Sequence, residues 1–130
     1  MRLIGHGIDL VEVDRIRDAV ERHGDRFLRR IYTAGEQAQA GDGPLRIQFL
    51  AGRFAAKEAV MKALGTGWAR GVAWTEIDVR RLASGKPELT LTGRCADIAA
   101  GLGVTAWELS ITHTGGHAAA SAVATGHGAG

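Results

Sequence analysis

A single long helix is the strongest structural signal in this sequence. Over about 46–64, apolar side chains recur at steps of three and four residues, which is the period of one face of an α-helix. These positions are Ile47, Leu50, Ala51, Phe54, Met61 and Leu64. The loop residues 41–44 precede the pattern, and the Gly-Thr-Gly segment 65–67 ends it. A chain of 130 residues makes one domain of ordinary size, so the other elements must pack around this helix.

Short apolar or alternating segments predict five strands. They are expected at 3–10, 76–82, 87–92, 107–112 and 118–124. Helical patterns cover 11–22 and 94–100. This order predicts an α+β fold, a single domain over 1–124 with a largely antiparallel sheet packed against the long helix. The Gly-rich residues 125–130 are expected to form a flexible tail.

The composition excludes several classes of function. No apolar run approaches the ~18 residues of a membrane span, and the first seven residues are too short an apolar stretch for a signal peptide. Aromatic residues (Trp 3, Tyr 1, Phe 3) are too few for a base-stacking platform. The one cysteine, Cys95, fits a reducing cytosol and is interpreted as a buried small residue. We therefore expect a cytoplasmic protein with no membrane segment and no nucleic-acid partner.

The most informative residue is Glu58, because it falls on the apolar stripe of the long helix. It lies four residues after Phe54 and three before Met61. A carboxylate that faces a core must be paired, protonated or bound to metal. An ion pair with Lys62 or a neighbouring arginine is one alternative. A hard-cation site is the other, and Asp9 at the end of the first strand is then the natural second carboxylate for Mg²⁺.

Cationic and histidine side chains offer further chemistry. Arg53, Lys57 and Lys62 suit a metal-bound pyrophosphate, although solvated helix charges explain each of them equally well. His113 lies where a strand enters a Gly-Gly turn, a position that a structural histidine also occupies. Strand alternation directs His113 and Ser110 to opposite faces, so the two are a poor nucleophile–base pair. A zinc site is not expected, because the histidines lack tight ligand spacing and the sequence has a single cysteine.

A basic segment follows the first strand. Residues 15–30 contain six arginines and three acidic residues, a net charge of +3 where the whole chain has +2. A solvated helix face is one interpretation, and a docking surface for an acidic partner is the other.

Four motifs in this chain resemble those of the holo-[acyl-carrier-protein] synthases, the short single-module 4′-phosphopantetheinyl transferases. Residues 7–16 (GIDLVEVDRI) resemble the N-terminal signature of that family, and 53–65 (RFAAKEAVMKALG) resemble its most specific one. Residues 85–87 (GKP) and 109–114 (LSITHT) follow in the family's order. The resemblance covers nearly the whole chain and is weakest at 35–45, where no role is carried over.

The resemblance implies a reaction. Coenzyme A donates its 4′-phosphopantetheine arm to a serine hydroxyl of apo acyl carrier protein and leaves as 3′,5′-ADP. It also implies Mg²⁺ as the cofactor, fatty acid biosynthesis as the process and the 4′-phosphopantetheinyl transferase fold. Positioning and charge neutralisation on the pyrophosphate then supply most of the catalysis.

The matching positions imply site residues. Asp9 and Glu58 match the metal ligands, and Lys62 and His113 join them as catalytic residues. Asp9, Glu58 and His113 stay rival candidates for the base. The positions expected to bind coenzyme A are Arg53, Lys57, Lys62, Gly85, Lys86, Pro87 and His113.

The resemblance also implies partners. Arg15, Arg22 and Arg26 match the positions that dock the acidic acyl carrier protein, and members of this short class are homotrimers with active sites between subunits. Two other functions stay open from the residues alone. One is a metal-dependent phosphohydrolase, which would release 3′,5′-ADP without an acceptor. The other is a non-catalytic module that binds through the basic segment.

Overall fold

The computed structural model describes residues 1–127, whose other helices and strands surround one long helix. In chain order the elements are β1 (Arg2–Glu12), α1 (Val13–His23), α2 (Asp25–Ile31), α3 (Ala34–Ala40), α4 (Arg46–Leu64), η1 (Gly67–Arg70), η2 (Trp74–Glu76), β2 (Ile77–Arg81), β3 (Pro87–Leu91), α5 (Gly93–Gly101), β4 (Val104–His113) and β5 (His117–Gly126).

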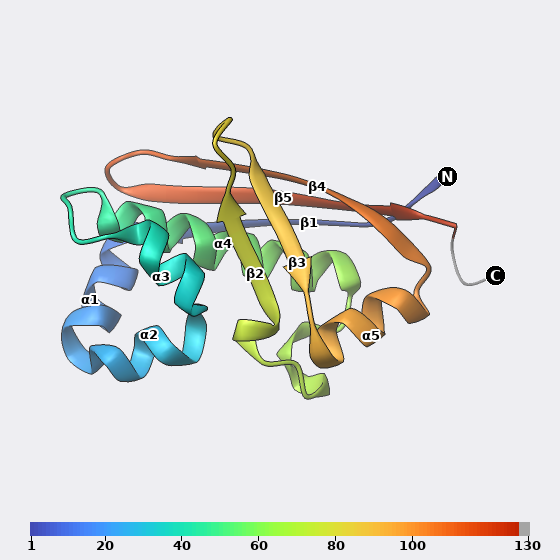
Figure 1. Ribbon diagram of the computed structural model, residues 1–130, viewed down its shortest axis with the longest axis horizontal. Coiled ribbons are helices and arrows are strands. Elements are labelled where there is room, and N and C mark those ends of the chain that lie inside the picture. Colours follow the sequence, from blue (N-terminus) through green and yellow to red (C-terminus); the bar gives the residue numbers. More distant parts are fainter. Residues whose placement is uncertain (128–130) are drawn as a thin grey trace.

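The strands form two antiparallel sheets (Figure 1). β1, β5 and β4 make a three-stranded sheet in that order, so β5 is its central strand. β2 and β3 make a separate two-stranded sheet. α4 lies along one face of the larger sheet, with α1–α3 towards one end of the molecule and α5 towards the other. The predicted α+β fold around the long helix is confirmed, whereas the sheet is divided in two.

Backbone contact sets the distance between α4 and β1. A Cβ atom added at Gly7 would lie 1.9 Å from the carbonyl oxygen of Ala59, and one added at Gly5 would lie 1.9 Å from that of Ala63. The glycines therefore let the strand touch the helix main chain. Alanines complete the contact from both sides, since α4 and the inner face of β5 bury a series of them. The glycines of β1 and the alanines of α4 and β5 thus allow the helix to pack closely against the sheet.

The short helix α3 was not predicted, and it begins with a capping box. The Thr33 hydroxyl accepts from the Glu36 N–H at 3.1 Å, and Oε1 of Glu36 accepts from the Thr33 N–H at 2.9 Å. This reciprocal arrangement satisfies two main-chain donors at the helix start. It also turns Glu36 inwards, where the side chain is fully buried.

The end of the chain differs from the expectation. Thr125 and Gly126 continue β5 and pair with the start of β1, and the His127 N–H donates to the Gly103 carbonyl at 3.1 Å. A flexible tail beginning at residue 125 is therefore wrong for these residues, because main-chain pairing extends the strand. The rest of the expected tail, 128–130, lies outside the described residues.

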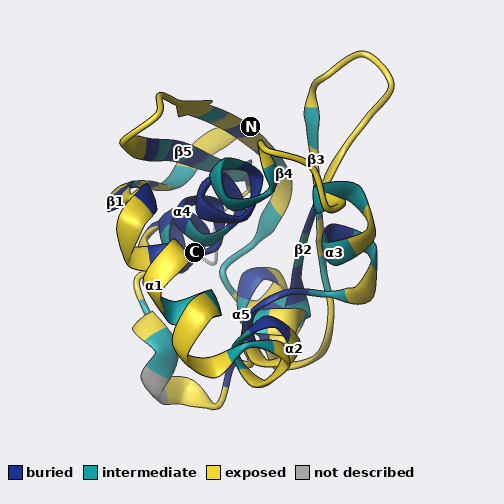
Figure 2. Cartoon of the chain, turned by 90° about the vertical axis from the view of Figure 1, so that its left-hand side faces the viewer, coloured by how far each residue is buried: buried dark blue, intermediate teal, exposed yellow. Residues whose placement is uncertain are grey.

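On one face of the three-stranded sheet, residues 1–127 leave large apolar side chains exposed. Figure 2 shows α4 buried in the interior, while α1 exposes most of its surface. Ile8 and Leu10 of β1 point away from α4 and are 61% and 68% exposed. No helix within residues 1–127 has the length and apolar character needed to span a membrane.

Candidate active site

The first half of the site lies where β1 passes α4. Gly7 faces Ala59 of the helix, and strand alternation directs Asp9 to the same side. Nζ of Lys62 donates to Oδ1 of Asp9 at 3.1 Å and to the Ile8 carbonyl at 3.0 Å. The sequence left open an ion pair between Lys62 and Glu58, but in the structure Lys62 pairs with Asp9.

Glu58 is half-buried beside this ion pair. Burial raises the pKa of Glu58, and the negative charge of Asp9 raises it further. A hydrogen bond from Trp68 Nε1 to Oε1 of Glu58, at 3.2 Å, opposes this increase, as do the positive charges of Lys62 and Arg15. The two predicted metal ligands and Lys62 therefore form one electrostatic group, and Arg15 acts on it from α1.

The donor set fits Mg²⁺ better than a softer metal. Mg²⁺ typically binds through one or two carboxylates and completes its shell with water and phosphate oxygens. Asp9 and Glu58 offer two carboxylates whose mutual repulsion a cation would relieve. Among residues 1–127 there is no cluster of three or more His, Cys, Asp or Glu side chains that could hold a metal by themselves. A closed zinc-type site is therefore absent from this part of the chain.

The second half of the site is a cavity of about 330 Å³ between α4, β4 and the β2–β3 hairpin. It unites four residues predicted to bind coenzyme A, together with two that the sequence did not single out. The four predicted residues are Arg53, Gly85, Pro87 and His113, and the two additional ones are Phe49 and Arg81.

Arg53 is held rigidly in the wall of this cavity. Its guanidinium lies 3.9 Å from the centre of the Phe49 ring, and Nε donates to the Val79 carbonyl at 3.4 Å. Burial and the nearby Arg81 lower the pKa of Arg53 to about 10, so the side chain stays charged at neutral pH. The buried Arg53 and the exposed Arg81 give the cavity the character of an anion site.

The structure separates His113 from the hydroxyls of its own strand. His113 lines the cavity, whereas Ser110 and Thr112 line a hollow on the opposite face of the sheet beside Ile8. This confirms that Ser110 and His113 do not form a nucleophile–base pair. At the hairpin tip, Lys86 is exposed and turns towards Glu108, with 3.8 Å between Nζ and Oε2.

Lys57 does not belong to either half of the site. Its side chain is 0% exposed, and Nζ lies 2.8 Å from Oε1 of Glu36. The same ammonium donates to the carbonyls of Trp74 (3.1 Å) and Ile77. The prediction that Lys57 binds coenzyme A is therefore wrong, because its three donors are used inside the protein. On α4 it points towards β2, not towards solvent.

α4 separates the two halves of the site. Arg53 and Glu58 are five residues apart, which places them about 140° apart around the helix axis. Asp9 lies on β1 and His113 on β4, the two edge strands of the sheet, with β5 between them. The metal-type carboxylates and the anion cavity thus open on different flanks of the same chain.

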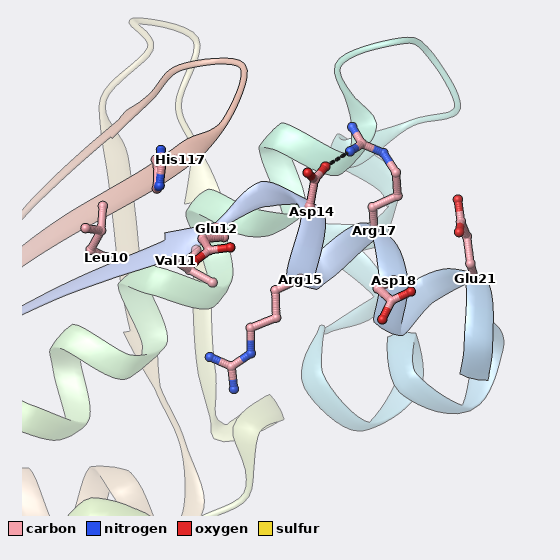
Figure 3. Close-up of a pocket in the computed structure, with 9 residues that line it drawn as sticks. All are labelled: Leu10, Val11, Glu12, Asp14, Arg15, Arg17, Asp18, Glu21 and His117. Atoms are coloured by element: carbon pink, nitrogen blue, oxygen red, sulfur yellow. Dashed lines mark hydrogen bonds and ion pairs between the residues drawn. The ribbon is translucent and has the colours of Figure 1, made fainter.

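The predicted docking arginines all lie on the exposed surface of α1 and α2. Arg22 pairs with Asp18 at 3.2 Å, and Arg26 is the second residue of α2, two residues after Gly24. A hollow of about 650 Å³ separates the start of α1 from the turn that leads into β5 (Figure 3). In Figure 3, Arg15 and Arg17 extend to different sides of α1, and Arg17 pairs with Asp14. Arg15 therefore lies on the side of α1 that faces Glu58. The spacing of arginines in the sequence did not indicate this.

Comparison of the sequence with known proteins agrees with this arrangement. Residues 5–122 match the family model of the 4′-phosphopantetheinyl transferase superfamily. A holo-[acyl-carrier-protein] synthase of Solibacter usitatus is 52% identical over 112 residues, which is 86% of this chain and 90% of that protein. A holo-[acyl-carrier-protein] synthase of Koribacter versatilis is 45% identical and covers 93% of this chain and 97% of its own length.

Solved structures match the fold over almost the whole chain. The holo-[acyl-carrier-protein] synthase of Neisseria meningitidis superposes with a TM-score of 0.86 at 31% identity, covering 95% of this chain and 99% of that one. The Helicobacter pylori enzyme, solved in complex with coenzyme A, gives a TM-score of 0.82 at 30% identity and covers 92% and 99%. With four motifs in order, the matching fold and relatives that align end to end, this chain belongs to the holo-[acyl-carrier-protein] synthases of the 4′-phosphopantetheinyl transferase superfamily.

Proposed function

We propose that this protein transfers the 4′-phosphopantetheine arm of coenzyme A to a serine of apo acyl carrier protein in a Mg²⁺-dependent reaction of fatty acid biosynthesis. The serine oxygen forms a bond to the phosphorus that carries the pantetheine. The bond from that phosphorus to the bridging pyrophosphate oxygen breaks, and 3′,5′-ADP leaves with the electron pair. The serine proton goes to a base, for which Asp9, Glu58 and His113 are the candidates.

The observation that carries this proposal is the pair of carboxylates on β1 and α4. Asp9 and Glu58 would hold Mg²⁺, which supplies charge neutralisation on the pyrophosphate oxygens when bound. Lys62 already binds Asp9 and lies beside Glu58, so its ammonium is placed to contact a phosphate as well. The half-buried setting strengthens these charge interactions relative to bulk water.

The cavity beside α4 is assigned to the other end of coenzyme A. Arg53 and Arg81 provide positive charge for a phosphate group. Gly85 and Pro87 bring the hairpin main chain to the rim, and His113 adds a ring nitrogen from β4. Lys86, exposed at the same tip, can swing towards a bound anion because its contact with Glu108 is long.

We assign the working form to a homotrimer with active sites between subunits. Two observations support this. The two halves of the site lie on different flanks of α4, so a second copy must bring the missing half to each. The face of the sheet that carries Ile8 and Leu10 leaves these two large apolar side chains exposed, as expected of a subunit interface. Light scattering should give three times the 13.7 kDa chain mass; a monomer with full activity would contradict this assignment.

The acidic carrier protein is proposed to dock on the exposed arginines of α1 and α2, namely Arg15, Arg22 and Arg26. Opposite charge steers such an encounter and makes its rate sensitive to salt. Because Arg15 also faces Glu58, the carrier would approach close to the metal-type carboxylates. We place the enzyme in the cytoplasm, since its single cysteine is a free thiol.

The test is a mass measurement on the carrier. The protein is incubated with coenzyme A, Mg²⁺ and several apo carrier proteins, and each carrier should gain one phosphopantetheine. The Glu58→Ala variant should keep its fold and lose Mg²⁺-dependent turnover, whereas Glu88→Ala on the exposed side of β3 should not. Folded protein that modifies no carrier would refute the proposal. Release of 3′,5′-ADP without a carrier would point to a phosphohydrolase instead.

A further inference from the structure

Immediately after α4 ends, the chain folds back so that η1 lies beside Glu58. Gly65 ends the helix in the left-handed conformation with φ of 75°, a region that favours glycine. The short helix η1 then places Trp68 against the helix it has just left. Its indole Nε1 donates to Oε1 of Glu58 at 3.2 Å, across ten residues of sequence.

The Trp68 ring is fixed by an aromatic stack. It lies on Trp74 of η2, with 3.8 Å between the ring centres and 22° between the planes. Trp74 in turn lies on Phe54, at 5.0 Å and 23°. Phe54 is on α4, one turn before Glu58, so the stack starts on α4 and its last ring, Trp68, returns to Glu58 of the same helix. The direction of the Trp68 N–H is therefore set by packed rings and not by a mobile side chain.

Each of the two carboxylates has one oxygen engaged by a protein donor. Oε1 of Glu58 accepts from Trp68, and Oδ1 of Asp9 accepts from Lys62. Among residues 1–127 no protein donor contacts the second oxygen of either group, which leaves it available to a cation. Hydrogen bonds of this kind hold a metal-binding side chain in its binding orientation, and their loss typically weakens metal affinity about 10–100-fold.

We propose that Trp68 is a positioning residue that orients the Glu58 carboxylate for the divalent cation. The proposal rests on the proposed function, in which Asp9 and Glu58 hold that cation. The indole acts through Glu58 and contacts neither substrate nor metal. The neighbouring rings of Trp74 and Phe54 serve the same end, since they hold the indole in place.

The first test measures Mn²⁺ binding by the intact protein in the presence of coenzyme A and the absence of carrier. Mn²⁺ takes the same oxygen ligands as Mg²⁺, and free Mn²⁺ is counted by its electron paramagnetic resonance signal. Trp68→Phe keeps an aromatic ring for the stack, although a smaller one, and removes the N–H donor. It should raise the Mn²⁺ dissociation constant about 10–100-fold. The matched control Trp107→Phe makes the same change on β4 and should leave binding unaltered.

Activity separates positioning from simple structural support. In Trp68→Phe the Mg²⁺ concentration needed for half-maximal turnover should rise by the same factor, and kcat should largely recover at saturating Mg²⁺. The KM for coenzyme A should change little. A lower melting temperature with an unchanged Mg²⁺ requirement would overturn the proposal and leave Trp68 a packing residue.

A second measurement needs no change at Trp68. The chain has three tryptophans, so ¹⁵N-labelled protein gives three indole N–H resonances, assigned by Trp74→Phe and Trp107→Phe. Mg²⁺ should shift the Trp68 resonance and leave that of Trp107 in place. If Glu58→Gln abolishes Mn²⁺ binding but Mg²⁺ does not shift the Trp68 resonance in the wild-type protein, the metal site stands and only the positioning role of Trp68 is refuted. If the wild-type protein binds no Mn²⁺, or binds it only as tightly as Glu58→Gln does, both the positioning role of Trp68 and the metal site of the proposed function are refuted.

Discussion

The buried ion pair between Lys57 and Glu36 gives the sharpest stability prediction. Oε2 of Glu36 accepts from the Val79 N–H at 2.7 Å, and Lys57 donates to the Ile77 carbonyl. The pair therefore ties α3 and α4 to β2. The substitution Glu36→Gln keeps the shape and one acceptor but removes the negative charge, which leaves the Lys57 ammonium buried without a counter-charge.

The expected loss of stability follows from that burial. Removing one partner of a buried ion pair costs about 3–5 kcal/mol, because the remaining charge is uncompensated. At ~2.1 cal/mol/K per residue, a chain of 130 residues loses about 11–18 °C in Tm. The double variant Glu36→Gln/Lys57→Met removes both charges and should regain much of this loss. Glu88→Gln, the same change on an exposed carboxylate, should alter stability by less than ~0.5 kcal/mol.

Thermal unfolding followed by circular dichroism at one fixed protein concentration measures these four proteins and the single variant Lys57→Met, which completes the double-mutant cycle. Fixed concentration matters because assembly contributes to Tm. A Glu36→Gln variant that melts within a few degrees of wild type would refute the reasoning. A double variant that loses the sum of both single losses would also refute it, since the two charges would then not be coupled.

Three further experiments test the helix–strand packing, the docking surface and the Cys95 thiol. Gly7→Ala should cost about 3 kcal/mol in chemical denaturation, because its Cβ meets a helix carbonyl, whereas Gly43→Ala, with open space around it, should cost little. Arg26→Glu should raise the KM for the carrier roughly tenfold (~1.4 kcal/mol) and leave the KM for coenzyme A unchanged. The control Arg94→Glu on α5 should change neither KM. An altered KM for coenzyme A in Arg26→Glu would contradict the docking assignment. Burial raises the pKa of Cys95 to about 11, so its thiol stays protonated at pH 8. The thiol should therefore react with Ellman's reagent only after unfolding. Rapid reaction in the native protein would show that the Cys95 thiol is accessible and would contradict this prediction.

Helical and strand periodicity predicted most of the fold correctly. The long helix begins and ends where its apolar period and the glycines at 65–67 indicated, and the hairpin and the last two strands lie near their predicted positions. These segments are long or strongly patterned, so local sequence is enough. The division into two sheets depends on strand pairing over long distances, which a single sequence does not reveal.

The candidate site was predicted unevenly for the same reason. Glu58 stood out because a carboxylate on an apolar stripe is a local anomaly. Lys57 was misassigned because its partner, Glu36, lies 21 residues earlier in a helix that was not predicted. The Thr33-x-x-Glu36 capping box was visible in the sequence and would have revealed that helix. Trp68 had no local signal, since its contact with Glu58 depends on the turn after α4.

The glycine–carbonyl contacts between β1 and α4 have a consequence for catalysis by this scaffold. Asp9 follows Gly7 by two residues, and Ala59 adjoins Glu58, so main-chain atoms in direct contact fix the spacing of the two backbone positions that carry the carboxylates. Side-chain repacking cannot widen that gap, because no rotamer separates touching backbones. The main chain around the two carboxylates is thus organised before any ion arrives, and a cation of a different size must adapt through its water shell rather than by moving the helix.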